Sequence, residues 1–437
     1  MTSVARNDST DIKYDRAQTL LRQLFDAAVT SALPENCVPP ALPTPPRGRT
    51  MVVGAGKASA AMARVVEQNW DGPIEGLVIT RHGHGVPCER IEVAEAGHPI
   101  PDEAGVAATQ KLIALLEGLT EDDLVLFLIS GGGSSLLTAP PPGVSLSEIQ
   151  AMTTQLLRSG ATIQQMNCVR KHVSMVAGGK LAGRARPAKL LTLAISDVPG
   201  DNPATVASGP TVPDHTTRHE ALETLKMLGI TPGPGIRKWL ERGESETSGP
   251  TGDNGDEFKI IASPQKALQA AADAARLAGY SPLVLSSAIE GEAREVATMH
   301  AAIAMQVKLY SQPVATPCIL LSGGETSVTV KGSGRGGRNT EFLLSLANAL
   351  DGTPGIYALA ADTDGIDGTE ANAGAIIGPD TLSTAKKMGV SGTAALTNSD
   401  SYGFFNAIDA LLVTGPTYTN VNDFRAILID STPDKRT

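Results

Sequence analysis

The feature that most constrains this sequence is a short run of aliphatic residues that stops abruptly in a glycine-rich turn. Leu124–Ile129 reads LVLFLI with no alternation of apolar and polar side chains, and residues 130–135 read SGGGSS. An unbroken apolar run of this length is typical of a strand that is buried on both faces of a parallel sheet. Because glycine has no Cβ, the N–H groups of the turn can surround an anion, and serine hydroxyls can donate as well. The stretch predicts a buried strand followed by an anion-binding loop, although a flexible turn remains the alternative.

The same pattern of an apolar run followed by a polar turn recurs along the chain. Alanine-rich or amphipathic helical patterns separate many of the runs, which is typical of an α/β fold. At 437 residues the chain is too long for one ordinary core, so we expect two domains. The expected strands besides the first lie at 51–53, 76–80, 189–195, 258–262, 283–285, 318–321, 356–361 and 411–413.

Lys57 is the first candidate site residue outside the glycine loop. It follows Gly54 and Gly56 at the end of an expected strand and precedes an alanine-rich helix. A lysine at a helix N-terminus is unfavourable for the helix dipole, so it indicates an anionic partner, with a solvated lysine as the alternative. A dinucleotide fingerprint would require a third glycine where Ser59 stands, and the spacing does not fit a Walker A loop. What remains is a phosphate site made of a strand, glycines, a lysine and a helix.

Two further candidates lie in the first half of the chain. Asp197 comes directly after the apolar run at 189–195, where doubly wound sheets place their chemistry. Arg170 belongs to the basic stretch NCVRKHVS at 167–174, which indicates either an anion-binding face or a solvated helix. Residues 231–257 are polar and rich in glycine and proline, so we expect a surface loop or domain junction there.

The second half of the chain repeats this arrangement. Ser322-Gly323-Gly324-Glu325 follows an apolar run and echoes the first glycine loop, which makes Gly323, Gly324 and Glu325 candidate binding residues. Arg338 stands among glycines just before an expected helix, as a second cation for phosphate.

Two carboxylates complete the set of candidate site residues. Asp362 and Asp364 follow the run at 356–361, and Mg²⁺ prefers a few carboxylates and keeps water for phosphate oxygens. Phosphate sites, carboxylates and a divalent ion are what phosphoryl transfer needs. The sequence has no G-x-S-x-G motif, which disfavours acyl transfer.

Composition excludes several other classes. The net charge of −10 argues against a nucleic-acid or anionic-membrane surface. Four widely spaced cysteines indicate reduced thiols, and no stretch is apolar enough for a membrane span, so we expect a cytoplasmic protein. The loop histidines are more commonly hydrogen-bonded than metal-bound; they are His82, His84 and His98.

In this order, the motifs resemble the successive sequence signatures of the glycerate 2-kinase family, the class with a C-terminal MOFRL domain, some members of which carry the name hydroxypyruvate reductase. The resemblance runs from about residue 15 to residue 430 and is therefore far more specific than any single loop. The motifs are GAGKAS (54–59), AGHPIPDE (96–103), SGGGSSLL (130–137), NCVRKHVS (167–174), SDVPGD (196–201), SGGETSVTV (322–330), GRGGRNTEF (334–342), ADTDGIDG (361–368) and TGPTYTNVND (414–423).

The resemblance implies two α/β domains flanking a cleft. These are a Rossmann-like larger lobe at 15–250 and a second lobe at 258–430, with the MOFRL domain at about 315–430. It implies ATP and Mg²⁺ as cofactors, and transfer of the γ-phosphoryl group to the 2-hydroxyl of D-glycerate. It leaves the oligomeric state open, with a homodimer as one possibility.

The resemblance also assigns roles by position. Lys57 and Arg338 are expected to stabilise the transferring phosphoryl group, and Asp197 to orient or deprotonate the 2-hydroxyl. The substrate carboxylate would lie on the glycine loop and Arg170, and Asp362 or Asp364 would hold Mg²⁺. The expected binding residues are Gly54, Gly56, Ser130, Gly131, Gly132, Gly133, Ser134, Ser135, Arg170, Gly323, Gly324 and Glu325.

The sequence departs from the family at one position and leaves two other functions open. Ala177 and Lys180 flank two glycines where the family more often has lysine and arginine. An NAD(P)H-dependent hydroxypyruvate reductase is the first alternative, but Ser59 and the absence of a suitably placed acidic ribose ligand disfavour it. A non-catalytic sugar-acid or nucleotide-binding protein is the second.

Overall fold

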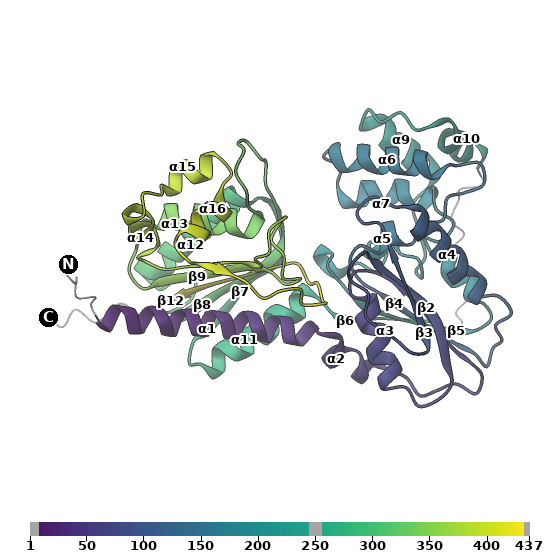
Figure 1. Cartoon of the computed structure of the whole chain (residues 1–437), viewed down its shortest axis with the longest axis horizontal. Coiled ribbons are helices and arrows are strands. Elements are labelled where there is room, and N and C mark those ends of the chain that lie inside the picture. The colour runs from purple at the N-terminus through teal and green to yellow at the C-terminus, as the bar shows by residue number, and fades with distance from the viewer. Residues whose placement is uncertain (1–7, 244–255, 432–437) are drawn as a thin grey trace. The chain divides into compact units, whose positions relative to one another are not determined.

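The computed structural model describes residues 8–243 and 256–431 and places them in two units (Figure 1). Residues 34–262 form the first unit, and residues 1–33 together with 263–437 form the second, each in its described part. Among the described residues, no helix combines the length and the apolar character that a membrane crossing requires.

The first unit is built on a parallel sheet of six strands in the order β3-β2-β1-β4-β5-β6. This order belongs to Rossmann-like folds, and it reverses direction between β1 and β4. The loops that leave β1 and β4 therefore emerge next to each other, at the topological switch point of the sheet. The strands are β1 (Thr50–Ala55), β2 (Ile74–Arg81), β3 (Ile91–Ala96), β4 (Leu124–Ile129), β5 (Lys189–Ile195) and β6 (Glu257–Ala262).

Helices cover the sheet because its strands are apolar on both faces. Leu112 and Leu181 belong to the core of one face, together with Val53 and Phe127 of the strands. Helix α3 follows β1 and contacts β1, β2 and β4. The helices around this sheet are α2 (Pro34–Cys37), α3 (Ser59–Gln68), α4 (Glu103–Leu115), α5 (Gly133–Leu136) and α8 (Lys180–Ala185), with 3₁₀ turns at Pro39–Ala41, Pro199–Asp201 and Val206–Ser208.

Four more helices of the first unit share a core of their own, in which Trp239 and Met152 are buried. The capping box at Ser145 and Glu148 is present at the start of α6, as the sequence predicts. Residues 231–257 are not a continuous loop, because α10 lies within them; residues 244–255 lie outside the described part. These helices are α6 (Leu146–Arg158), α7 (Ile163–His172), α9 (Arg218–Met227) and α10 (Pro234–Arg242).

The second unit contains a mixed sheet in the order β11-β10-β9-β12-β8-β7. Only β7 and β8 pair in parallel, and each remaining pair is antiparallel. The last strand, β12, lies in the middle of the sheet between β8 and β9. The strands are β7 (Ser281–Glu292), β8 (Cys318–Ser327), β9 (Ile356–Asp362), β10 (Gly374–Ile377), β11 (Leu411–Leu412) and β12 (Asp423–Ile429).

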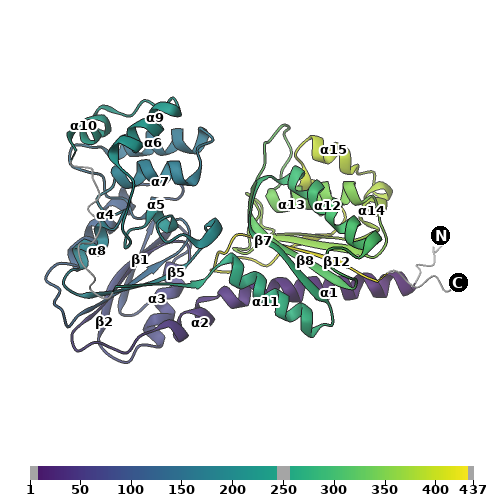
Figure 2. The same ribbon diagram turned by 180° about the vertical axis from the view of Figure 1, so that it is seen from behind.

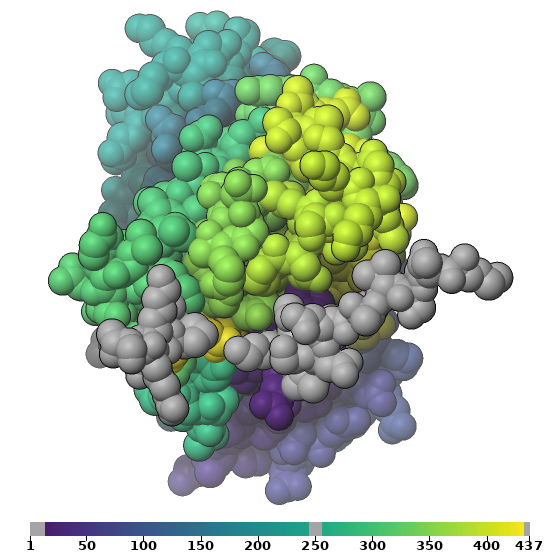
Figure 3. Space-filling model, turned by 90° about the vertical axis from the view of Figure 1, so that its left-hand side faces the viewer, coloured from purple at the N-terminus to yellow at the C-terminus, as the bar shows by residue number. Residues whose placement is uncertain are grey.

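Helices lie on both faces of this second sheet, and Figure 2 shows α1 and α11 running alongside each other beneath it. The opposite face packs on α12, α13 and α16 through a core that includes Phe342 and Phe404. Figure 3 faces this unit, and its yellow-green surface belongs to the later helices of the chain. The helices are α1 (Asp8–Ala32), α11 (Pro264–Leu277), α12 (Ala293–Tyr310), α13 (Arg338–Leu350), α14 (Thr381–Lys387), α15 (Gly392–Thr397) and α16 (Ser401–Ala407).

The structure places helix α1 differently from the expected domain boundaries. The sequence assigns residues 15–33 to the first domain, whereas α1 packs in the second unit. Leu21, Leu24 and Phe25 are buried there, and the ring of Phe25 lies 5.8 Å from that of Phe424 on β12. An apolar helical stripe predicts burial but does not identify the sheet that buries it.

The expected loop at residues 322–325 is a second correction. These residues lie inside β8, which continues to Ser327. Gly324 has φ +130, and a Cβ there would lie 2.2 Å from the carbonyl oxygen of Ile289. The glycine thus permits a close approach of β7, whose pairing with β8 shifts register nearby, rather than a turn.

Candidate active site

The two loops at the switch point of the first sheet interlock. The backbone N–H of Lys57 donates to the carbonyl oxygen of Gly131 at 2.8 Å, and that of Ala58 donates to Ser130 Oγ at 3.0 Å. Ser130 is fully buried, so its hydroxyl joins the loops instead of facing a ligand. Gly56, at φ +144, leaves room for it, because a Cβ would lie 2.1 Å from Ser130 Oγ. The lysine is thereby held against the glycine loop, as the sequence predicts.

Each glycine of the SGGG turn lies so close to a different neighbouring residue that a Cβ at that position would clash with it. A Cβ on Gly131 would lie 1.8 Å from Asp197 Oδ2, and one on Gly132 would lie 2.9 Å from the His98 ring and 3.6 Å from Lys57 Cγ. A Cβ on Gly133 would lie 2.6 Å from Ala207. The turn therefore gathers Lys57, Asp197 and His98 around its backbone. Gly54, in contrast, lies inside β1 and permits close packing on β4, since its Cβ would meet Leu128 O at 2.0 Å.

Two serines of the loop make defined contacts. Ser134 Oγ lies 2.9 Å from Ser208 Oγ, which in turn donates to Asn167 Oδ1 at 2.9 Å. Ser135 Oγ donates to the Gly132 carbonyl oxygen at 3.1 Å. Both side chains are half-buried, so they remain accessible at the rim of the loop.

His98 is a site residue that the sequence placed only among loop histidines. Its pKa falls to about 4, first because the ring is buried and then because Lys57, Arg81, Arg170 and His84 are nearby. A ring with this pKa is neutral at pH 7. Three cationic side chains around a neutral ring create a positive potential that attracts an anion.

Arg170 differs from the rest of its basic cluster. Lys171 pairs with Asp214 at 3.1 Å, and Lys180 Nζ donates to the Lys171 and Ser174 carbonyl oxygens at 2.7 and 2.6 Å. Within the described residues Arg170 makes no ion pair and no side-chain hydrogen bond. Burial lowers the pKa of Arg170. A half-buried arginine without a carboxylate, in an acidic protein, indicates a site for an external anion.

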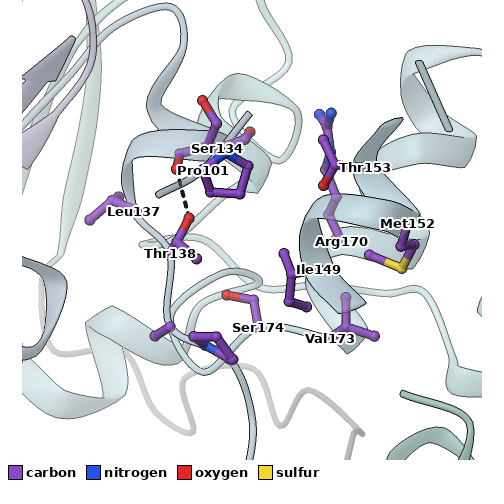
Figure 4. A pocket seen from close by; sticks show the side chains of 13 residues that line it. Pro101, Ser134, Leu137, Thr138, Ile149, Met152, Thr153, Arg170, Val173 and Ser174 are labelled. Atoms are coloured by element: carbon purple, nitrogen blue, oxygen red, sulfur yellow. Dashed lines mark hydrogen bonds between the residues drawn. The ribbon is translucent and has the colours of Figure 1, made fainter. Parts of the chain in front are cut away.

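A pocket opens beside Arg170 (Figure 4). Its walls come from the segment that follows the glycine loop, from α6 and from the end of α7. Ser134 and Ser135 lie at the loop side, and Met152 and Thr153 lie on the helical side. The pocket thus continues the anion site into the helical part of the first unit.

In the second unit Arg338 begins α13 and is held by two carboxylates. Its Nε donates to Asp423 Oδ1 and its Nη2 donates to Asp362 Oδ2, each at 2.6 Å. Asp423 begins β12 and pairs in register with Asp362, which ends β9, because the two strands are antiparallel. Asp423 also accepts from Asn339 Nδ2 at 2.8 Å and from Arg425. The sequence did not single out Asp423, since it begins a strand rather than following one.

Burial and these contacts shift the pKa values of the two acids in opposite directions. Burial raises the pKa of Asp362 well above its usual range, although Arg338 opposes the shift. Burial also acts on Asp423, but Arg338 and Arg425 overcome it and lower the pKa of that carboxyl. The two acids in turn raise the pKa of Arg338, against the effect of burial. Arg338 is therefore a permanent cation with a fixed orientation.

The acids expected to hold Mg²⁺ do not form a ligand set in the described structure. Asp362 is paired with Arg338, and Asp364 Oδ1 accepts the Ile366 N–H at 2.9 Å. Asp367 accepts from the N–H groups of Asn339 and Thr340. The described residues contain no group of three or more histidine, cysteine or acidic side chains placed to bind a metal ion. Glu325 is exposed.

Family models match both units. A model described as a domain of unknown function, DUF4147, matches residues 20–241, and a model of the MOFRL family matches residues 318–423.

Relatives extend over nearly the whole chain. A D-glycerate 2-kinase of Thermotoga maritima is 40% identical over 403 residues, which cover 92% of this chain and 95% of the relative. A protein of Agrobacterium vitis with the provisional name hydroxypyruvate reductase is 52% identical over 416 residues, 94% of each chain.

Solved structures agree with the observed fold. The crystal structure of a glycerate kinase from Thermotoga maritima superposes with a TM-score of 0.86 at 38% identity, and covers 95% of this chain and 100% of that one. A protein of Pyrococcus horikoshii gives a TM-score of 0.82 at 34% identity, with 95% and 99% covered.

Proposed function

The chain belongs to the glycerate kinase family that joins a DUF4147 domain to a MOFRL domain, and from this premise we propose that it phosphorylates the 2-hydroxyl of D-glycerate with ATP. As a glycerate kinase it is a phosphotransferase. The transfer to the 2-hydroxyl, rather than the 3-hydroxyl, draws on the relatives named as 2-kinases.

The observation that carries the proposal is the cluster around the SGGG turn. Lys57, Asp197 and His98 all lie against this one turn, with Arg170 close by. Phosphoryl transfer needs positioned cations and an oriented acceptor more than it needs a nucleophilic side chain. The cluster supplies both kinds of group at the carboxyl edge of a Rossmann-like sheet.

Each side chain has a distinct part in this proposal. Lys57 stabilises the charge of the transferring phosphoryl group. Asp197 orients the 2-hydroxyl and accepts its proton. Arg170 binds the carboxylate of glycerate, because it is a buried cation without a protein partner. N–H groups of the turn and the hydroxyls of Ser134 and Ser135 are further donors.

Arg338 is a fixed cation of the second unit. Asp423 and Asp362 hold its Nε and Nη2, so its remaining nitrogen is available to a phosphate. Mg²⁺ would enter with the nucleotide, since it binds phosphates and water readily and needs few protein carboxylates. In this proposal Asp362 holds the guanidinium group of Arg338 in its orientation.

The proposal is tested by ³¹P NMR of the protein with MgATP and D-glycerate. We expect a 2-phosphoglycerate signal, and we expect Lys57→Met to lower kcat by roughly 10²–10³-fold. Lys111→Met is the control, because Lys111 is an exposed lysine of the same unit that pairs only with Glu92.

A parallel reaction with hydroxypyruvate and NAD(P)H tests the alternative that the name of the Agrobacterium vitis relative suggests. Nicotinamide oxidation without phosphoryl transfer would show that the protein is a reductase rather than a kinase. The structure gives this alternative little support, since Ser59 is buried and donates to Gly56 O and Ile79 O at 2.8 Å, where a dinucleotide fingerprint has glycine.

A further inference from the structure

We propose that Thr153 and Arg170 together form the subsite that selects glycerate, with Arg170 on its carboxylate and Thr153 on its 3-hydroxyl. This inference rests on the proposed function and assigns a selective role to a residue of α6 that no motif contains.

The hydroxyl of Thr153 is unusual in its surroundings. Only 5% of the residue is exposed, and its hydroxyl makes no hydrogen bond within the described part of the chain. The next residue, Thr154, behaves as a threonine in a helix usually does and donates to the Gln150 carbonyl oxygen at 2.9 Å. The hydroxyl oxygen is not sealed off from solvent, so it opens into the pocket that Thr153 lines and can bond to a ligand there.

Thr153 and Arg170 face the same cavity. They come from neighbouring helices, α6 and α7, and both line the pocket that Ser134 and Ser135 close on the loop side (Figure 4). These serines already have partners, whereas Thr153 and Arg170 do not. The two unsatisfied groups of the pocket are thus a hydroxyl and a cation.

The size and lining of the pocket restrict what can fill it. It holds about three water molecules, and much of its wall is apolar, as at Leu137, Met152 and Val173. A three-carbon acid with a terminal hydroxyl fits it, because its two ends match the two unsatisfied groups and its carbon atoms meet the apolar wall.

This arrangement gives a physical basis for selectivity. D-lactate has the carboxylate and 2-hydroxyl of glycerate but lacks the 3-hydroxyl. When D-lactate binds, its methyl group covers the hydroxyl of Thr153 without bonding to it, and a site built to hydrogen-bond a hydroxyl discriminates against an analogue without it.

The test compares Thr153→Val, which keeps the shape and removes the hydroxyl, with Thr153→Ser, which keeps the hydroxyl. Thr154→Val is the matched control on the same helix, outside the pocket. For each enzyme we would measure KM and kcat for D-glycerate, the competitive inhibition constant of D-lactate, and the KM for ATP.

We expect Thr153→Val to raise the KM for D-glycerate by about tenfold, with the D-lactate constant unchanged or lower and the ATP KM within about twofold of the wild type. Thr153→Ser and Thr154→Val should stay near the wild type. An unchanged D-glycerate KM in Thr153→Val overturns the inference. A parallel weakening of D-lactate also overturns it, because it would indicate general damage to the pocket.

If the proposed kinase function itself is wrong, the experiment gives a different result. In that case the wild-type enzyme itself forms no 2-phosphoglycerate. Calorimetric titration of D-glycerate and D-lactate into the same four proteins, without nucleotide, then decides on the subsite alone, by the same criteria.

Discussion

Arg338 Nε and Asp423 Oδ1 lie 2.6 Å apart, although 85 positions separate the two residues in the sequence. Asp362 holds Nη2 of the same guanidinium at the same distance, and within the described residues Nη1 makes no hydrogen bond. Two carboxylates thus hold Nε and Nη2 of the guanidinium group and leave Nη1 for a ligand. Fixed guanidinium groups suit phosphate recognition, because little flexibility is lost when the ligand binds.

This relationship predicts the behaviour of Asp362→Asn. Loss of one charge-assisted hydrogen bond, worth roughly 1.5–3 kcal/mol, should lower kcat by about tenfold or more, because Arg338 loses its orientation. The Mg²⁺ concentration at half-maximal rate should stay unchanged in a titration at saturating ATP. Asp380→Asn, an exposed acid of the same unit, is the control. A large rise in the Mg²⁺ requirement would instead identify Asp362 as a metal ligand.

Arg170→Met should separate activity from stability. The KM for D-glycerate should rise by about 10- to 100-fold, since a charge-assisted hydrogen bond to the carboxylate is lost. The melting temperature should rise by about 2–4 °C, because the folded protein no longer buries an unpaired cation. Kinetics and thermal unfolding check the two effects, with Arg158→Met, at the exposed end of α6, as the control. A lower melting temperature with an unchanged KM would show that Arg170 is structural.

The ring of His98 should stay neutral through the physiological range. Its pKa of about 4 lies below that of a histidine in the unfolded chain, so above pH 6.5 both states hold a neutral ring. As the pH falls from 6.5 towards 4, the unfolded chain takes up a proton that the folded protein does not, and the folded state loses stability. NMR titration of the ring and urea unfolding between pH 7 and 4.5 check this. His98→Gln should reduce the pH dependence of the urea midpoint, and titration of His98 near pH 6.5 would contradict the assignment.

Gly131→Ala tests the contact between the glycine turn and Asp197. The new methyl group would lie 1.8 Å from Asp197 Oδ2, so the carboxylate has to move. A displacement of about 1 Å at a reacting group can lower the rate by roughly 10²-fold, which is the fall in kcat we expect. Gly183→Ala is the control, because its Cβ meets nothing within 4 Å and alanine favours the helix α8. Equal kcat values for the two variants would remove Asp197 from the chemistry.

The Rossmann-like first unit was predictable from the sequence because its strands are continuous apolar runs. Leu124–Ile129 forms the central strand β4, and the capping box at Ser145 forms. The meeting of Lys57 with the glycine loop also followed, since parallel strands bring their carboxyl ends to one edge. Regular local patterns were sufficient for these features.

The second sheet was harder to predict because one of its central strands carries a charge. Residues 423–429 read DFRAILI, and no strand is expected there from the sequence, in which Asp423 ends the motif at 414–423. In the structure Arg425 is fully buried, because it pairs with Asp423 and Thr326 and lies over the ring of Phe342. Such compensation depends on residues far apart in the chain, which no local pattern reveals.

The distance between partners in the sequence also explains why the contact of Asp362 with Arg338 was not predicted. Asp362 and Asp364, which follow an apolar run, resemble a metal site when only neighbours in sequence are considered. The partner of Asp362, Arg338, lies 24 positions away, and Asp423 reaches the same arginine only because β12 runs antiparallel to β9.

The position of β12 also determines the order in which the chain can fold during synthesis. All six strands of the first unit precede residue 263, so this unit can form early. The second sheet cannot close until β12 has left the ribosome and entered between β8 and β9. Until then α1 can pack on α11 but has no Phe424 on which to pack Phe25. The packing of α1 is therefore completed only when β12 is in place, and a chaperone that shields this helix would find its Phe25 side exposed until β12 has been made.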